Sequence, residues 1–517
     1  MRNRLVILTL SVFFLCLGVR IYCLSEKSIL EGDELTSLTL AYNNTGYGDN
    51  TYISGHIYTA SELKRNLYLD DTGGVAGYAS DIKSLWSDNR DPSHASLYYM
   101  LLRTALLGVG FPAIKETILW GCGLNILLFV ITFFLILSAA RRLLGKDSPA
   151  VSLVLLLAFM SPLSISNTML LREYQLAECM AALFFLVLIS LVDRIKSDTD
   201  ILTFKDTAIT SLVSAALVSS GYFNTFLIIL SCAYVVCISY RNRRLKGTLI
   251  FIAVTATAAI LLAKLMYNGF FNFLTDVRTS EVMDKAEGLN FASNLTHSLK
   301  FCLAFVCLDI LNPIVIAVSI VYLMKDKTFL KHFRKVQYQY LIITGCWTAL
   351  IMFFTTWKIP QYIAPCASLL CLSFALLFKD VNLKKHILPT SLIFLAISIY
   401  PFLATSIYPV ASLRRLHVYP TVSKDFKWPE AGTLYLYAPG DDKEERHTLT
   451  LLIPYLHDNQ RCVILNSTAQ IEETARLSRQ DKIYVFGYSF RELKELPCFL
   501  SSYRFNNWQD IYEYAAG

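Results

Sequence analysis

Two neighbouring carboxylates, Asp33 and Glu34, follow the first apolar stretch of the chain. A carboxylate just outside a membrane can act as a general base that deprotonates an acceptor hydroxyl or amine. The same pair can hold a divalent cation, Mg²⁺ or Mn²⁺, that neutralises a phosphate leaving group. The structural alternative is an acidic first turn that caps a helix. Spacing alone leaves both interpretations open.

A second polar group combines Asp91 and His94 with a tyrosine pair, Tyr98 and Tyr99. The proline after Asp91 favours a helix start, and in a helix His94 and Tyr98 lie one turn apart on the same face. The pattern predicts a catalytic turn that faces the acidic pair, with both tyrosines near the acceptor. The alternative is a capped helix whose tyrosines sit at the level of the lipid headgroups.

Charged residues also stand where an apolar stretch begins, in Arg172-Glu173-Tyr174. Ionisable groups at the edge of a membrane are costly unless they are paired or functional. The planar fork of Arg172 suits a phosphate, and the alternative is an interfacial ion pair with Glu173.

Lys358 joins two apolar stretches and is followed closely by Gln361 and Tyr362. By the charge bias described below it lies on the outer side, where lysine is uncommon. It is a candidate to neutralise a second phosphate oxygen, and the alternative is an interfacial anchor.

Composition places these groups in a membrane protein. Of the 517 residues, 54% are hydrophobic and only 17% are charged, which favours a polytopic α-helical chain over soluble domains. Stretches of about 20 apolar residues can cross the hydrocarbon core. The sequence predicts about 11 transmembrane helices, near 5–24, 116–140, 149–166, 174–192, 206–222, 223–240, 248–267, 298–323, 338–357, 360–378 and 387–406.

Lysine and arginine clusters recur after every second predicted span. The positive-inside rule then predicts a cytoplasmic amino terminus and an extracytoplasmic acidic pair. These loops account for the net charge of +7, so no nucleic-acid partner is indicated. We expect a multi-pass protein of a bacterial inner membrane.

Residues 1–406 are predicted to form the membrane module, which includes a long extracytoplasmic loop, 25–115, with a short interfacial helix near 96–110. Residues 407–517 alternate strand-like and helix-like segments, which predicts a small extracytoplasmic α/β domain. Strands are expected at 433–437, 462–465 and 482–486, and helices at 444–456, 467–478 and 489–496. No GxGxxG motif occurs, which argues against a nucleotide site, and whether Cys462 and Cys498 pair stays open.

In this order, the polar groups resemble the GT-C superfamily of membrane glycosyltransferases. The branch concerned is that of the protein O-mannosyltransferases and bacterial aminoarabinose (lipid A) transferases. Four motifs carry the likeness: Asp33-Glu34, His94-Ala95-Ser96-Leu97-Tyr98-Tyr99, Arg172-Glu173-Tyr174 and Gln361-Tyr362-Ile363-Ala364-Pro365. The chain departs from the branch where Ala95 and Ser96 replace two prolines. It departs again where Gln361 replaces an arginine, which leaves Lys358 as the cation at that end.

The resemblance implies a hexosyl or pentosyl transferase whose donor is a sugar on a polyprenyl phosphate. Arg172 and Lys358 would hold the phosphate, with Tyr174, Gln361 and Tyr362 beside it.

In the implied mechanism Asp33 acts as base in a single inverting displacement onto a glycan, lipid or protein acceptor. Glu34 or Asp91 would orient the acceptor or a metal ion, and His94 would hydrogen-bond Asp33 or the phosphate. The sugar, the acceptor, metal dependence and oligomeric state stay open.

Three other functions compete with the transferase. A transporter or flippase for lipid-linked glycans would be expected to show internal repeats and polar residues near the bilayer midplane. An oligosaccharide ligase would share the general architecture, and a catalytically silent scaffold would bind a partner through its carboxyl-terminal domain. The outer position of the charged residues favours the enzyme.

Overall fold

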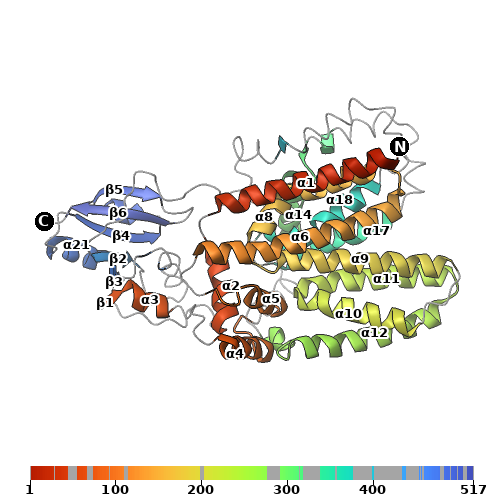
Figure 1. The fold of residues 1–517 in the computed structure, drawn as a ribbon, viewed down its shortest axis with the longest axis horizontal. Helices are drawn as coiled ribbons and strands as arrows, with labels where there is room; N and C mark the ends of the chain where they lie inside the picture. The colour runs from red at the N-terminus through yellow and green to blue at the C-terminus, as the bar shows by residue number, and fades with distance from the viewer. Residues whose placement is uncertain are drawn as a thin grey trace.

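The chain is a mostly helical protein with a small β-sheet domain near its carboxyl terminus (Figure 1). The computed structural model describes residues 2–27, 30–44, 55–66, 74–91, 94–109, 114–197, 203–275, 291–313, 315–317, 338–355, 358–376, 397, 399–400, 433–437, 453, 456, 459–477, 482–488, 491–497, 499–504 and 509–515.

The helices form a bundle and a smaller group at one end of it (Figure 1). The bundle contains α1 (Arg2–Glu26), α6 (Ile114–Leu144), α7 (Ala150–Phe159), α8 (Pro162–Met169), α9 (Tyr174–Lys196), α10 (Phe204–Ser219), η1 (Tyr222–Asn224), α11 (Thr225–Arg241), α12 (Leu245–Met266), η2 (Asn272–Thr275), α14 (Phe291–Phe305), the π-helical η3 (Val306–Ile310), α17 (Tyr338–Phe354), η4 (Pro360–Cys366) and α18 (Ala367–Ala375). The smaller group contains α2 (Gly32–Asn43), α4 (Gly74–Ser87) and α5 (Leu97–Ala105), whereas α3 (Ala60–Asn66) lies beside the sheet.

Six helical segments in the described part of the chain are long and apolar enough to cross a membrane. They are Leu5–Glu26, Ile114–Leu144, Tyr174–Lys196, Tyr222–Arg241, Leu245–Met266 and Phe291–Ile310. Shorter apolar helices cover Tyr338–Phe354 and Pro360–Ala375, where two further spans were predicted. Most of the predicted span 387–406 lies outside the described residues.

The predicted span 149–166 corresponds to two helices, α7 and α8, which together are long and apolar enough for a span but are bent by 54° at the break between them. Pro162 stands at the first turn of α8, and Ser161 caps that helix by accepting from the Ser164 backbone N–H at 3.2 Å. A buried arginine of α1 bridges the break: Arg20 donates to the Phe159 carbonyl at 2.9 Å and to the Thr168 hydroxyl at 2.9 Å.

The predicted loop 25–115 is largely structured where it is described. Helix α5 occupies the place of the predicted short helix and packs against α2, α4 and α6. Its side chains Tyr98, Tyr99 and Leu102 are fully buried. The loop therefore forms a packed helical layer over the end of the bundle.

The carboxyl-terminal domain is built on a six-stranded sheet in the order β1-β3-β2-β4-β6-β5. Its strands are β1 (Ile57–Thr59), β2 (Thr433–Tyr437), β3 (Arg461–Leu465), β4 (Lys482–Tyr488), β5 (Phe499–Arg504) and β6 (Gln509–Ala515). The three predicted strands correspond to β2, β3 and β4, which are parallel to one another. Strands β1, β5 and β6 are antiparallel additions that the sequence analysis did not predict.

Of the predicted helices in this domain, 467–478 corresponds to α21 (Thr468–Leu477) and 489–496 to the shorter α22 (Arg491–Lys494). The predicted helix 444–456 lies almost wholly outside the described residues. Cys462 is a buried free thiol, and Cys498 lies outside the described residues.

The sheet domain does not begin at residue 407, because β1 comes from the loop between α2 and α4. Ile57 faces Val463 and Tyr58 faces Cys462 across the antiparallel pair. One continuous apolar cluster joins Tyr58 and Leu63 to Leu434 of the sheet and to Leu35 of α2. Loop and sheet are therefore packed as one layer at this end of the bundle.

The basic ends of the helices lie away from that layer. Arg141 and Arg142 stand in the last turn of α6, and Arg194 and Lys196 in the last turn of α9. In Figure 1 these helix ends lie near the amino terminus, at the end of the bundle remote from the sheet.

Candidate active site

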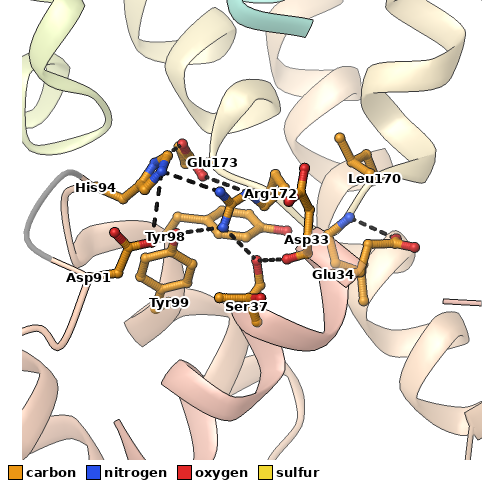
Figure 2. A network of polar contacts seen from close by, with 12 residues as sticks. Asp33, Glu34, Ser37, Asp91, His94, Tyr98, Tyr99, Leu170, Arg172 and Glu173 are labelled. Atoms are coloured by element: carbon orange, nitrogen blue, oxygen red, sulfur yellow. Dashed lines mark hydrogen bonds and ion pairs between the residues drawn. The ribbon is translucent and has the colours of Figure 1, made fainter. Parts of the chain in front are cut away.

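Three segments that are distant in sequence meet at the sheet-facing end of the bundle (Figure 2). They are the first turn of α2, the segment that leads into α5, and the short turn between α8 and α9. Five residues of the predicted motifs, Asp33, Asp91, His94, Tyr99 and Arg172, lie together there.

Arg172 is at the centre of the group and is only 5% exposed. Its Nη1 donates to the Tyr99 hydroxyl at 3.2 Å and to the Ser37 hydroxyl at 3.4 Å. Its Nη2 lies 3.3 Å from His94 Nε2. Burial acts to lower the pKa of Arg172, but Tyr99, Glu173 and Asp33 outweigh burial, so the pKa rises and the guanidinium stays charged.

His94 connects this arginine to two carboxylates. Its Nδ1 lies 2.6 Å from Glu173 Oε1, and its Nε2 lies 3.7 Å from Asp91 Oδ2. Burial acts to raise the pKa of Glu173, but His94 and Arg172 outweigh it and hold the pKa at about 2. Glu173 is therefore an ionised anchor for the histidine ring rather than a proton carrier near neutral pH.

Three buried polar atoms of this group have no hydrogen-bond partner among the described residues: Arg172 Nε, Glu173 Oε2 and Asp91 Oδ2. An unpaired buried polar group costs free energy, and native structures rarely keep one without a reason. Arg172 Nε lies 3.8 Å from Glu173 Oε2, and Asp91 Oδ2 lies 3.7 Å from His94 Nε2, so these charged groups are ion-paired without hydrogen bonds. One donor and two acceptors thus keep hydrogen-bonding capacity for a ligand that carries both kinds of group.

The adjacent carboxylates of α2 point in different directions. Asp33 is partly exposed and lies beside Arg172, across the guanidinium from His94 in the view of Figure 2. Glu34 is fully buried and turns away. Glu34 Oε2 accepts from Lys27 Nζ at 3.0 Å and from the Glu31 N–H at 2.8 Å, and Oε1 accepts from the Leu171 N–H at 3.0 Å.

The predicted sharing of a metal ion or of catalysis between Asp33 and Glu34 is not supported by this geometry. Glu34 serves as the capping-box residue of α2 and as the partner of Lys27. Within the part of the chain that the structure describes, no three His, Cys, Asp or Glu side chains converge to hold a metal ion. Glu34 is a positioning residue for the α2 start.

The two tyrosines of the predicted pair also make different contacts. Tyr99 contacts Arg172 through its hydroxyl, whereas the Tyr98 hydroxyl donates to Asn125 Oδ1 at 3.2 Å inside the protein. Both side chains are fully buried. Tyr98 thus anchors α5 to α6, and only Tyr99 belongs to the polar group around Arg172.

The motif that contains Gln361 and Tyr362 lies beside the start of α9. The Tyr174 and Tyr362 rings meet edge to face with centroids 6.1 Å apart. Gln361 is 6% exposed, and its Nε2 has no hydrogen-bond partner among the described residues. Gln361 therefore retains a buried donor that can serve a ligand.

Lys358 has a different position from the one expected of a phosphate ligand. Its Nζ donates to the carbonyls of Met352, Phe353 and Thr355, the last two at 3.3 and 2.7 Å. These carbonyls lie in the last turn of α17 and just after it, where a lysine stabilises the negative end of the helix. In this structure Lys358 caps α17.

Sequence reasoning missed three residues that hold the site in place. Lys27 pairs with Glu34, and Ser37 accepts a hydrogen bond from Arg172. Arg20 bridges the break between α7 and α8, which precedes the turn that carries Arg172. A signal existed for Arg20, because an arginine in the middle of an apolar span is costly without partners. Nothing in the local pattern marks Lys27 or Ser37.

Comparison with known proteins gives a distant structural likeness. No known protein family and no curated protein matches the sequence. Crystal structures of ArnT from Cupriavidus metallidurans are similar in architecture, both at 12% sequence identity. The structure bound to undecaprenyl phosphate has a TM-score of 0.48, with 98% of this chain and 97% of that chain covered. The apo structure has a TM-score of 0.44, with 99% and 98% covered.

Proposed function

We propose that this protein is an integral-membrane glycosyltransferase of GT-C type. It would transfer a sugar from a polyprenyl-phosphate carrier to an extracytoplasmic acceptor. The observation that carries the proposal is the buried, charged Arg172, whose Nε makes no hydrogen bond among the described residues, set beside the partly exposed Asp33 at the end of an apolar bundle. A lipid carrier lies in the membrane, so its phosphate reaches the protein at such an end.

Arg172 is suited to the phosphate of the carrier. When the bond between the sugar carbon and the phosphate oxygen breaks, negative charge develops on the leaving polyprenyl phosphate. A preorganised guanidinium in a buried site stabilises this charge better than water does. Tyr99, Ser37 and His94 fix the orientation of the guanidinium, which leaves Nε for the ligand.

Asp33 is suited to the acceptor. As the acceptor oxygen or nitrogen attacks the sugar carbon, its proton passes to the Asp33 carboxylate, and the sugar carbon inverts in a single displacement. Arg172 is the cation of this step, whereas Lys358 would have to leave its carbonyl partners to take part. The surplus of carboxylates, Asp33, Asp91 and Glu173, matches a ligand rich in hydroxyl donors.

Clustering of the basic helix ends away from the site supports an outer location for the chemistry. Arg141, Arg142, Arg194 and Lys196 stand at the opposite end of the bundle. By the positive-inside rule that end faces the cytoplasm, and the site and the sheet domain face outward.

A reconstituted assay tests the proposal. Wild-type protein and Asp33→Asn are placed in liposomes with a panel of polyprenyl-phosphate sugars and cell-envelope extract, and release of free polyprenyl phosphate is followed. We expect release by the wild type and a loss of about 10²–10⁴-fold in Asp33→Asn, the usual contribution of a general base. Glu62→Gln is the matched control, since Glu62 lies in the same loop and its carboxylate accepts from the Thr59 N–H and hydroxyl beside β1, away from the polar group around Arg172.

Transport of a lipid-linked glycan is the second candidate, and the broken α7–α8 pair favours it, because transporters often contain discontinuous helices. The same liposomes separate the two functions. The protein is a flippase and not a transferase if the lipid-linked sugar crosses the bilayer without release of polyprenyl phosphate and if Asp33→Asn leaves this movement unchanged.

A further inference from the structure

A loop after α12 is attached to the segment that carries Asp91. Trp86 Nε1 donates to the Leu265 carbonyl at 2.8 Å, and the Asn268 N–H donates back to the Trp86 carbonyl at 2.8 Å. Asn272 Nδ2 donates to Asp88 Oδ1 at 2.9 Å. In Figure 1 this end of α12 lies beside α4. These bonds hold the loop against one side of the candidate active site.

The loop supplies aromatic rings. The Tyr222 ring, from the turn between α10 and α11, stacks on Phe273 with centroids 4.3 Å apart and an interplanar angle of 29°. Phe270 packs at 5.7 Å from the same ring. Tyr267 is fully buried, and its hydroxyl accepts the Asn89 N–H at 3.3 Å.

Two buried oxygens in or near this aromatic group make no hydrogen bond among the described residues. The Tyr222 hydroxyl is buried and has no hydrogen-bond partner among the described residues. Asp91, which is 8% exposed, has an Oδ2 that makes no hydrogen bond and lies 3.7 Å from His94 Nε2. Asn89 connects Asp91 to the aromatic group, because Asn89 Oδ1 accepts the Asp91 N–H at 3.0 Å while the Asn89 N–H donates to the Tyr267 hydroxyl. The Tyr222 hydroxyl and Asp91 Oδ2 belong to different elements, and neither makes a hydrogen bond among the described residues.

We propose that Asp91, Tyr222 and the adjoining aromatic loop form a subsite for the sugar of the lipid-linked donor. The inference rests on the proposed function and specifies where its sugar binds. Carboxylate and phenol oxygens can pair with sugar hydroxyls, and the half-buried Phe273 offers apolar surface for the carbon face of the ring, the usual composition of a ligand site.

The position agrees with the phosphate site. The same ring nitrogen, His94 Nε2, lies 3.3 Å from Arg172 Nη2 and 3.7 Å from Asp91 Oδ2. The guanidinium and the carboxylate are therefore neighbours of one imidazole. A sugar phosphate can therefore place its phosphate on Arg172 and its ring toward Asp91 and Tyr222.

Tyr222→Phe tests the subsite because it removes only the unpaired oxygen. Binding of polyprenyl phosphate and of polyprenyl phosphoglucose, phosphogalactose and phosphomannose is measured in detergent for the wild type and the variant. For at least one glycosylated lipid we expect about threefold to tenfold weaker binding, as for loss of one neutral hydrogen bond. Bare polyprenyl phosphate should bind unchanged, and the melting temperature should not fall.

Tyr400→Phe is the control, since its hydroxyl donates to the Leu308 carbonyl at 2.7 Å and has no place in the subsite. This variant should lose melting temperature and keep its affinity for every lipid. If bare polyprenyl phosphate binds and Tyr222→Phe leaves all glycosylated lipids unaffected, the subsite is disproved and the proposed function survives. If the wild type binds neither bare nor glycosylated lipid, the proposed function fails and the subsite fails with it.

Discussion

At the scale of single residues, the site depends on the different contacts of two consecutive carboxylates, Asp33 and Glu34. Successive residues of an α-helix point about 100° apart, so the Asp33 and Glu34 side chains leave α2 in different directions. Glu34 turns inward to Lys27 and to the Leu171 N–H. That contact holds α2 against the turn that carries Arg172, which leaves Asp33 beside the guanidinium.

Lys27→Met is expected to destabilise the protein strongly. The Lys27 and Glu34 side chains are 1% and 0% exposed, and removing one partner of a buried ion pair costs about 3–5 kcal/mol. Thermal unfolding in detergent measures the effect. The double variant Lys27→Met/Glu34→Gln should recover part of the loss, and a single variant as stable as the wild type would contradict the buried pair.

The low pKa of Glu173 predicts that the folded protein loses stability in acid. Its pKa falls from 4.5 to about 2 on folding, so the unfolded chain binds its proton first. The contribution of Glu173 is complete above pH 4.5 and disappears as the pH falls toward 2. Unfolding followed from pH 6 to pH 2 should show a flatter decline in Glu173→Gln than in the wild type, and parallel curves would refute the His94–Glu173 pairing.

At the scale of elements, the break between α7 and α8 decides where Arg172 lies. A continuous helix would carry residues 162–173 onward along the α7 axis. Pro162 and the Ser161 cap end that path, and Arg20 satisfies the Phe159 carbonyl that the break exposes. The short α8 then delivers the Arg172 turn to α2 and α5.

Arg20→Met tests this arrangement. The variant leaves the Phe159 carbonyl and the Thr168 and Ser164 hydroxyls without the Arg20 donors, and a buried acceptor left unsatisfied costs about 1–3 kcal/mol. Arg194→Ala is the control, because Arg194 is 41% exposed in its pair with Asp206 and such pairs contribute about 0–1 kcal/mol. Equal melting temperatures for the two variants would exclude a bridging role for Arg20.

At the scale of the whole molecule, the sheet domain is tied to the loop that carries the site. Strand β1 lies between α2 and α4 in sequence but pairs with β3 of the carboxyl-terminal domain. Removal of the sheet domain would therefore expose the apolar cluster around Tyr58 and Leu434.

A disulfide tests the pairing of β1 with β3. Tyr58 faces the free thiol of Cys462 across the antiparallel pair, and facing residues of such pairs lie within disulfide reach. Tyr58→Cys should crosslink on mild oxidation, so that fragments from protease cleavage between the bundle and the sheet stay joined until reduction. Ile57→Cys, which faces Val463, should not crosslink, and the absence of a crosslink in both variants would contradict the register.

The sequence by itself determined the features that depend on short patterns. Apolar stretches marked the helices, strand-like runs marked β2, β3 and β4, and charged residues at helix starts marked Asp33, Asp91, His94 and Arg172. Each of these signals comes from residues within a few positions of one another.

Only the tertiary structure decided the features that depend on distant contacts. Glu34 is excluded from the site by a bond to Leu171, 137 residues away. The three residues of β1 are too few to be recognised as a strand without their partner β3. Lys358 caps α17 because backbone carbonyls point at its ammonium group, and no sequence pattern encodes their direction. The physical reason is common to all three: a polar side chain takes the partner that the fold brings to it, and spacing along the chain specifies only the nearest candidates.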